Sequence, residues 1–170
     1  MKKVVKFGGS SLANAEQFQK VGDIIRSEES RRYVVPSAPG KRFSADTKVT
    51  DLLYTCYDKA EAGEDFTDAL TEIKGRFYEI IKGLNLDLSL EEEFRQIEAD
   101  FKAHAGNEYA ASRGEFLNGK VMAAYLGYEF IDSATVIRFD KNGNFDADKT
   151  DKLLSKRLQK CERAVIPGFY

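Results

Sequence analysis

The residues best suited to chemistry lie near the start of the chain, where Lys6 is followed by Gly8, Gly9 and Ser10. The apolar run that ends at Phe7 predicts a short buried strand, and the pattern of a helix begins a few residues after the glycines. Glycines at such a junction let backbone N–H groups face an anion, and the helix N-terminus behind them adds partial positive charge. We therefore expect a phosphate site that the Lys6 ammonium completes, because a lysine in an apolar strand needs a partner for its charge. The alternative is an edge strand whose Lys6 points into water.

A second polar group follows the next predicted strand, residues 31–35, which ends at Pro36. A strand, a helix and a strand in such a short stretch predict a βαβ unit with parallel strands. Ligands bind outside the carboxyl ends of parallel strands, so Ser37 is expected at the same edge as the two glycines. An ordinary loop explains Ser37 almost as well.

The segment 41–48 is polar and is expected to be flexible. Its basic residues either meet phosphates or are solvated, and solvation is the commoner outcome. A helix is predicted from Val49 to about Ala62, with Thr47 or Thr50 as its N-cap.

A third candidate is Glu115, in a helix predicted over residues 107–126. It lies off the expected core stripe, which includes Ala124, and on a face with small residues such as Gly119. Small residues one turn away leave room for a ligand to approach the carboxylate. Gly114 in mid-helix costs roughly 1 kcal/mol relative to alanine, so we expect it to be in close contact with neighbouring backbone. An exposed glutamate on a solvated face is the alternative.

Amphipathic patterns predict further helices that act as scaffold. Asn14 is the expected N-cap of the first, and Ser89 opens a capping box before another. Leu153 is expected to face inward in the last helix, and His104 to lie in solvent. These helices span residues 14–29, 66–104 (two helices, divided at 83–85) and 147–160.

Strands are predicted at 128–132, 135–139 and 163–167, with a polar turn at 140–144. Four or five short strands that alternate with helices predict an α/β fold, a three-layer αβα sandwich with a mainly parallel sheet. The chain ends on an apolar run, residues 165–170, whereas natural termini are usually polar. We therefore expect a truncated chain whose uncovered last strand associates through its free edge.

Several of these motifs together resemble the amino acid kinase family, and within it the aspartokinases. Residues 6–12 match the opening signature of that family, whereas the P-loop and dinucleotide-binding glycine patterns are absent. Further matches follow in order: residues 50–53 (Thr-Asp-Leu-Leu), residues 112–115 (Ser-Arg-Gly-Glu) and residues 165–169 (Val-Ile-Pro-Gly-Phe). An insertion after Gly40 departs from the spacing of the family.

The resemblance implies transfer of the ATP γ-phosphoryl group to the side-chain carboxylate of L-aspartate, the first step towards lysine, threonine and methionine. ATP would bring Mg²⁺ with it. Lys6 would be catalytic, because its charge stabilises the transferring group. The implied phosphate contacts are Lys6, Gly8, Gly9 and Ser10. The implied substrate contacts are Ser37, Thr50 and Glu115, with Glu115 facing the ammonium of the amino acid.

The resemblance also implies how the domains of the protein are organised. Residues 1–170 would be the N-terminal lobe of an amino acid kinase domain. The nucleotide-binding half, an arginine for the substrate carboxylate and the regulatory domains would lie in later sequence. The fragment alone is then expected to be inactive, and the full-length protein to be a homo-oligomer.

Three other interpretations stay open. A glutamate, acetylglutamate or uridylate kinase would share the opening signature, although residues 50–53 and 112–115 favour aspartokinase. A non-catalytic amino-acid-binding module is the second interpretation. A helical interaction domain is the third, and it would place Lys6 and Glu115 on opposite faces.

Composition and charge exclude several classes of protein and partner. The chain has 170 residues, of which 42% are hydrophobic and 32% charged, which is typical of a globular protein. A net charge of −2 without a basic stripe gives no reason to expect nucleic acid or anionic lipid as a partner. No apolar run is long enough to span a membrane, and one histidine with two distant cysteines, Cys56 and Cys161, makes a zinc site implausible. We expect a cytoplasmic protein with reduced thiols.

Overall fold

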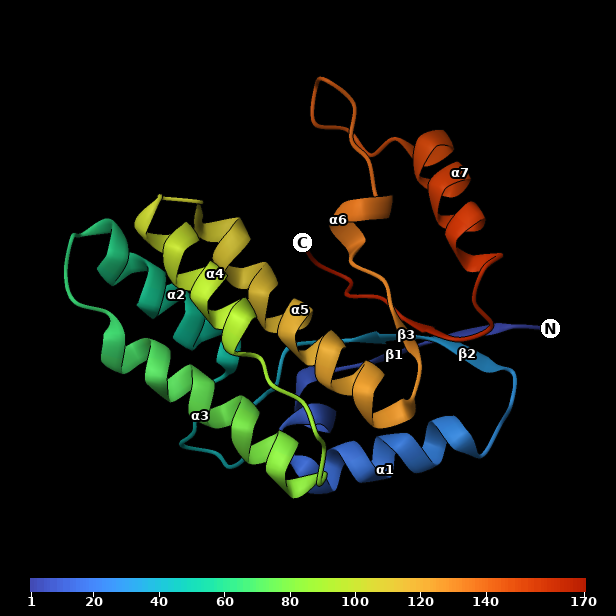
Figure 1. Cartoon of the computed structure of the whole chain (residues 1–170), viewed down its shortest axis with the longest axis horizontal. Coiled ribbons are helices and arrows are strands. Elements are labelled where there is room, and N and C mark those ends of the chain that lie inside the picture. Colours follow the sequence, from blue (N-terminus) through green and yellow to red (C-terminus); the bar gives the residue numbers. More distant parts are fainter.

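The computed structural model describes all residues from 1 to 170, and a parallel sheet of four strands lies at its centre (Figure 1). The strand order is β1-β2-β4-β3, so β4 lies inside the sheet and β1 and β3 form its edges. All neighbouring strands are parallel, which confirms the predicted α/β class. The strands are β1 (Lys3–Phe7), β2 (Arg31–Pro36), β3 (Glu129–Phe130) and β4 (Ala164–Val165).

Seven α-helices and one short 3-10 helix surround the sheet (Figure 1). The first half contains η1 (Gly9–Leu12), α1 (Ala15–Arg26), α2 (Val49–Glu61) and α3 (Thr67–Gly83). The second half contains α4 (Glu91–Lys102), α5 (Asn107–Leu126), α6 (Ser133–Val136) and α7 (Ala147–Leu158).

The two faces of the sheet carry different apolar cores, and this makes the architecture three-layered. Val34 and Val165 belong to the larger core, together with residues of α1 and α5. Their chain neighbours Tyr33 and Ala164 belong to a smaller core, which includes Val136 of α6 and is flanked by residues of α7. Successive side chains of a strand point to opposite faces, so each strand serves both cores. Figure 1 shows α1 below the sheet, and α6 and α7 above it.

A group of four helices, α2 to α5, lies beside the sheet (Figure 1). Its centre is aromatic, because Phe77, Phe94 and Phe101 are fully buried there. Each such side chain contributes about 1.5–3 kcal/mol by leaving water. The group therefore fixes α2 and α5, which carry Thr50 and Glu115.

Several local predictions are confirmed. The Asn14 side chain caps α1 by accepting the N–H of Gln17 at 3.0 Å. The helix α5 has the predicted bounds, and the break between α3 and α4 falls after Gly83 as expected. His104 is exposed, although its Nδ1 lies 2.7 Å from a carboxylate oxygen of Glu61. Cys56 and Cys161 are both free thiols.

The strand predicted at 135–139 is wrong, because the chain forms the short helix α6 there. The Asp132 side chain accepts the N–H of Ala134 at 3.0 Å, and the Thr135 hydroxyl donates to the Asp132 carbonyl at 2.6 Å. These local bonds start a helix and override the strand preference of the β-branched residues. Phe139 pairs with Phe145 only in an isolated antiparallel bridge, across the predicted polar turn.

Some predicted caps and core positions are also wrong. Neither Thr47 nor Thr50 caps α2, whose N-cap is Lys48 without a side-chain bond. The N-cap of α4 is Leu90, so Ser89 forms no capping box. Ala124 is exposed although it was expected in the core of α5.

Two further positions differ from the prediction. Val165 is fully buried, since β4 lies between β2 and β3 and not at a free edge. Leu153 was expected to face inward but is 37% exposed. No helix of the chain combines the length and apolar character needed to cross a membrane.

Candidate functional site

The loops that follow β1 and β2 lie against each other at one edge of the sheet. The N–H of Ser37 donates to the carbonyl of Phe7 at 3.0 Å, and the N–H of Gly40 donates to the carbonyl of Gly9 at 2.8 Å. A Cβ on Gly9 would lie 2.8 Å from the Ala38 carbonyl oxygen, and the site therefore requires glycine there. A Cβ on Gly40 would come within 2.8 Å of the Gly9 backbone. Sequence reasoning singled out Gly9 but not its partner Gly40.

These loops form the wall of a cavity of about 550 Å³. Five of the seven predicted site residues line it, and they come from both loops, from α2 and from α5. They are Gly9, Ser10, Ser37, Thr50 and Glu115. Residues far apart in sequence thus meet at the edge where the βαβ argument placed the site.

The other two predicted residues, Lys6 and Gly8, lie beside the cavity and do not line it. Lys6 is exposed on the edge strand β1, as the alternative interpretation had it. Its positive charge nevertheless acts on Glu115, because it helps to lower the pKa of that carboxyl. The helical-domain interpretation required Lys6 and Glu115 on opposite faces, and the structure does not place them so.

Glu115 is half-buried in the wall of the cavity, and its hydrogen-bond partners are backbone N–H groups. The N–H of Gly168 donates to its Oε2 at 3.0 Å. Burial raises the pKa of Glu115 above its usual range, and the backbone N–H groups of Gly168 and Phe169 and the Lys6 charge only partly oppose this. A carboxylate with so little compensation is stabilised further when a cation binds.

The small residues of α5 have a different role from the predicted one. A Cβ on Gly114 would lie 2.7 Å from the Cβ of Ala38, and one on Gly119 would lie 2.9 Å from the ring of Phe130. Protein atoms therefore fill the space that was expected for a ligand. Gly114 is in close contact as expected, but with side-chain atoms of Ala38 and Leu53 and not with backbone, and this contact brings α5 against the loop that carries Ser37.

Asn118 also joins α5 to this loop and was not recognised in the sequence. It is fully buried, and its Nδ2 donates to the Ser37 carbonyl at 2.7 Å. A buried asparagine one turn after Glu115 is the signal that sequence reasoning missed, because buried polar groups need partners.

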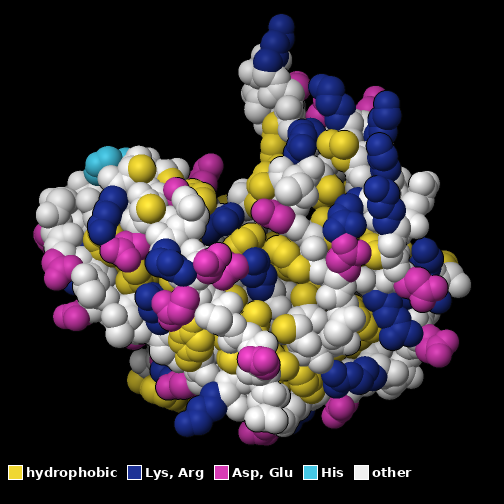
Figure 2. All heavy atoms as spheres, viewed as in Figure 1, with side chains coloured by type: hydrophobic (Ala, Val, Ile, Leu, Met, Phe, Trp, Pro, Cys, Tyr) yellow, Lys and Arg dark blue, Asp and Glu magenta, His cyan; other side chains and the backbone are white.

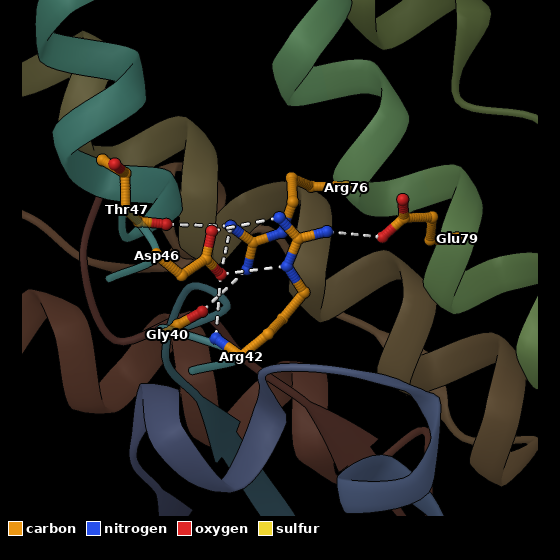
Figure 3. Close-up of polar contacts among 6 residues, drawn as sticks. All are labelled: Gly40, Arg42, Asp46, Thr47, Arg76 and Glu79. Carbon is orange, nitrogen blue, oxygen red and sulfur yellow. Dashed lines mark hydrogen bonds and ion pairs between the residues drawn. The ribbon is translucent and has the colours of Figure 1, made fainter. Parts of the chain in front are cut away.

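The segment 41–48 is held in place by ion pairs, which corrects the prediction that it is flexible (Figure 3). Arg76 projects from α3, and its side chain is only 3% exposed. Its guanidinium donates to the carbonyls of Gly40 at 2.7 Å and Thr47 at 2.8 Å, and it pairs with Asp46 at 3.2 Å. One buried arginine thus connects both ends of the segment.

Arg42 completes this network from the surface (Figure 3). Its side chain pairs with Asp46 at 2.9 Å and with Glu79 at 2.8 Å, and its backbone N–H donates to Asp46 at 2.8 Å. The hydrogen bonds from Arg42 and the charge of Arg76 hold the pKa of Asp46 well below its usual range. We call these residues, Arg42, Asp46, Arg76 and Glu79, the arginine clamp.

A second cavity of similar volume, about 560 Å³, lies between β3, α6 and α7. None of the predicted site residues lines it. No group of three or more histidine, cysteine, aspartate or glutamate side chains is placed to hold a metal ion by itself.

Comparison with known proteins identifies the family of the chain. The model of the amino acid kinase family matches residues 1–170. The chain belongs to the amino acid kinase family. Aspartokinase 3 of Bacillus subtilis is 38% identical over 183 aligned residues, which cover 99% of this chain and 40% of that protein. The chloroplastic aspartokinase 1 of Arabidopsis thaliana is 32% identical and covers 72% of this chain and 23% of its own length.

Solved structures of this family have the same fold. Aspartate kinase of Clostridium acetobutylicum superposes with a TM-score of 0.94 at 47% identity, over 100% of this chain and 39% of that one. Aspartokinase III of Escherichia coli, solved in complex with aspartate and ADP, superposes with a TM-score of 0.77. It is 23% identical and covers 99% of this chain and 40% of that one, so it supports the fold alone. The chain therefore spans about two fifths of the length of these family members.

Proposed function

We propose that this chain is the N-terminal lobe of an aspartate kinase, which transfers the γ-phosphoryl group of ATP to the side-chain carboxylate of L-aspartate. The observation that carries the proposal is the cavity itself, where Gly9, Ser10, Ser37, Thr50 and Glu115 come together from four separate segments. The aspartokinase relatives in Bacillus and Clostridium support the choice of substrate.

In the proposed reaction an oxygen of the aspartate carboxylate attacks the γ-phosphorus of ATP. A new P–O bond forms to the carboxylate, the bond to the β–γ bridging oxygen breaks, and ADP leaves with the electron pair. The nucleophile is already ionised at neutral pH, so the reaction needs alignment and charge stabilisation more than a general base. Mg²⁺, bound with ATP, would neutralise part of the phosphate charge.

Each predicted residue has a place in this scheme. Lys6 is the catalytic residue, because its positive charge stabilises the phosphoryl group in transit. Glu115 binds the ammonium of aspartate. The ammonium compensates the negative charge of Glu115, which burial disfavours. The remaining contacts follow from position: Gly8, Gly9 and Ser10 for phosphate oxygens, and Ser37 and Thr50 for the amino acid.

The chain spans 40% of the Bacillus relative, so we propose that further sequence supplies the rest of the nucleotide pocket, the arginine for the substrate carboxylate and the regulatory domains. We call this longer protein the complete enzyme. It would act in the cytoplasm as a homo-oligomer, in the pathway to lysine, threonine and methionine.

The test is an assay of ADP release, coupled to NADH oxidation, on the complete enzyme and on residues 1–170. We expect L-aspartate-dependent turnover by the complete enzyme and none by the 170-residue chain, because phosphoryl transfer needs groups on both sides of the moving phosphorus. L-Glutamate, N-acetylglutamate and UMP serve as competing acceptors. Faster turnover with any of them would show that this acceptor, and not aspartate, is the substrate. Turnover by the short chain would contradict the proposed division of the site.

A further inference from the structure

Two lysines, Lys41 and Lys48, have no role in the scheme above, yet they line the same cavity as Glu115. Both are exposed. The other basic residue of their segment, Arg42, pairs with Asp46 and Glu79. Neither lysine takes part in any ion pair of the structure. The cavity wall thus contains two positive charges without partners.

The arginine clamp fixes the backbone directly before each of these lysines (Figure 3). The Gly40 carbonyl that Arg76 binds belongs to the residue before Lys41. The Thr47 carbonyl that Arg76 binds belongs to the residue before Lys48. A single buried guanidinium therefore places both lysines at the cavity. A merely solvated loop would not need a buried cation, which is costly unless it is well bonded.

The charges of the wall point to one class of ligand. Glu115 is the only carboxylate that lines the cavity, and Lys41 and Lys48 are the only cations. A ligand that complements this wall carries one positive and two negative groups. A dicarboxylic amino acid has this set, with one ammonium and two carboxylates. Inorganic phosphate or the phosphates of a nucleotide would leave Glu115 without a cation.

We propose that Lys41 and Lys48 bind carboxylate oxygens of the dicarboxylic amino acid whose ammonium Glu115 holds, together with the arginine proposed in later sequence for one of its carboxylates, and that Arg76 is the positioning residue for both lysines. The inference rests on the proposed function and extends it. Charge-assisted hydrogen bonds from two lysines would orient the acceptor carboxylate and would discriminate against amino acids with a neutral side chain.

The first experiment measures steady-state kinetics of the complete enzyme with Lys41→Gln and Lys48→Gln, and with Lys152→Gln as the control. Lys152 is exposed on α7 and does not line the cavity. Each cavity variant is expected to raise the KM for L-aspartate about tenfold, as the loss of one charged hydrogen bond in a partly exposed site would do. The KM for ATP should stay within about twofold, as should all constants of the control. An unchanged KM for aspartate, or a rise confined to the KM for ATP, overturns the proposal.

The second experiment needs no turnover and uses succinate, which has two carboxylates and no ammonium. Calorimetry is expected to show succinate binding that weakens about tenfold in Lys48→Gln but changes little in Glu115→Gln. Equal losses in both variants would overturn the assignment of carboxylates to the lysines. A wild-type protein that binds succinate without turning over aspartate would contradict the proposed function while supporting this inference.

The positioning role of Arg76 is tested with Arg76→Lys, which keeps the charge but lacks the fork that reaches two carbonyls. The KM for aspartate should rise, and the effect should be less than additive with Lys48→Gln, because both changes disturb the same contact. Retention of the melting temperature within a few degrees identifies variants that remain folded. Full additivity, or a lower stability with an unchanged KM, would make Arg76 merely structural.

Discussion

Two carboxylates, Asp46 within the segment 37–48 and Glu115 in the cavity that this segment lines, differ in how far the fold compensates their charge. Asp46 is only 8% exposed in its side chain, and it accepts bonds from Arg42 and pairs with Arg76. These partners hold its pKa well below the usual range. Glu115 is half-buried with the backbone N–H groups of Gly168 and Phe169 as its partners, and burial raises its pKa.

The contrast separates a group that builds the site from one that is available to a ligand. The charge of Asp46 is compensated inside the protein, so the group contributes to stability and has no capacity left for a ligand. The charge of Glu115 is compensated only in part, so a bound cation would supply what the fold does not. Figure 2 shows acidic and basic side chains interspersed over most of the visible face, so the pattern of surface charge alone does not reveal this difference.

The largest expected effect tests the clamp. Arg76→Met leaves Asp46 and two carbonyls without their buried partner. We expect the free energy of unfolding to fall by about 3–5 kcal/mol, as is usual when one member of a buried ion pair is removed. Urea denaturation of the complete enzyme provides the measurement.

The matched control is Arg95→Met, since Arg95 is 69% exposed on α4 and pairs only with the exposed Glu92. It should change the free energy of unfolding by less than about 1 kcal/mol. If Arg76→Met were as mild as this control, the clamp would not hold the loop.

The next effect tests the cavity side of the comparison. Lys6→Met should lower kcat by about 10²–10³, which is the range for removing one group that stabilises transition-state charge. The affinity for aspartate and the melting temperature should change little, because Lys6 is exposed on an edge strand.

Lys3→Met on the same strand is the control, since Lys3 pairs with Glu28 and does not line the cavity. It should leave kcat within about twofold of the wild type. A Lys6→Met enzyme with normal turnover would reduce Lys6 to an ordinary surface residue.

The cavity side was largely predictable from sequence, whereas the clamp was not. Glycines after a strand and a serine after the next strand lie at the same edge of any parallel sheet, so local pattern was sufficient for Gly9 and Ser37. Arg76 lies between Ile73 and Ile80 on the apolar face of α3. This position indicates a buried cation but does not predict which residue pairs with it. Its partner Asp46 is thirty residues away, and no local rule pairs positions at that distance.

The same limit explains the errors of the fold. The contact between Gly9 and Gly40 joins two loops and becomes visible only when both strands are paired. The position of β4 inside the sheet depends on strand order, which hydrophobic pattern does not specify. At Thr135 the β-branched residue type suggested a strand, but hydrogen bonds to Asp132 determined a helix.

The smallest expected effect is on the pH dependence of stability, where Glu115 and Asp46 contribute with opposite signs. Folding raises the pKa of the Glu115 carboxyl. Such a group contributes stability that is present below its pKa in the unfolded chain, and this stability is lost as pH rises through its pKa in the folded protein. At pH 7 to 8 the ionised Glu115 therefore weakens the fold. Asp46 has the opposite sign, because its lowered pKa contributes stability that is present at neutral pH and lost when pH falls below the usual range of aspartate.

Glu115→Gln should accordingly raise the free energy of unfolding at pH 7 to 8, by roughly 1 kcal/mol or less, and the gain should vanish at pH 4. Asp46→Asn should lower it at pH 7 to 8, and most of this cost should remain at pH 4, because the stability from a lowered pKa is lost only below the usual range of aspartate. Urea denaturation of both variants at the two pH values gives the comparison, with Glu162→Gln, an exposed position, as the control. The gain in Glu115→Gln should come with about tenfold weaker aspartate binding, because the ammonium loses its charged partner. If Glu115→Gln were less stable than the wild type at neutral pH, Glu115 would be a compensated structural carboxylate like Asp46, and the distinction between the two carboxylates would fail.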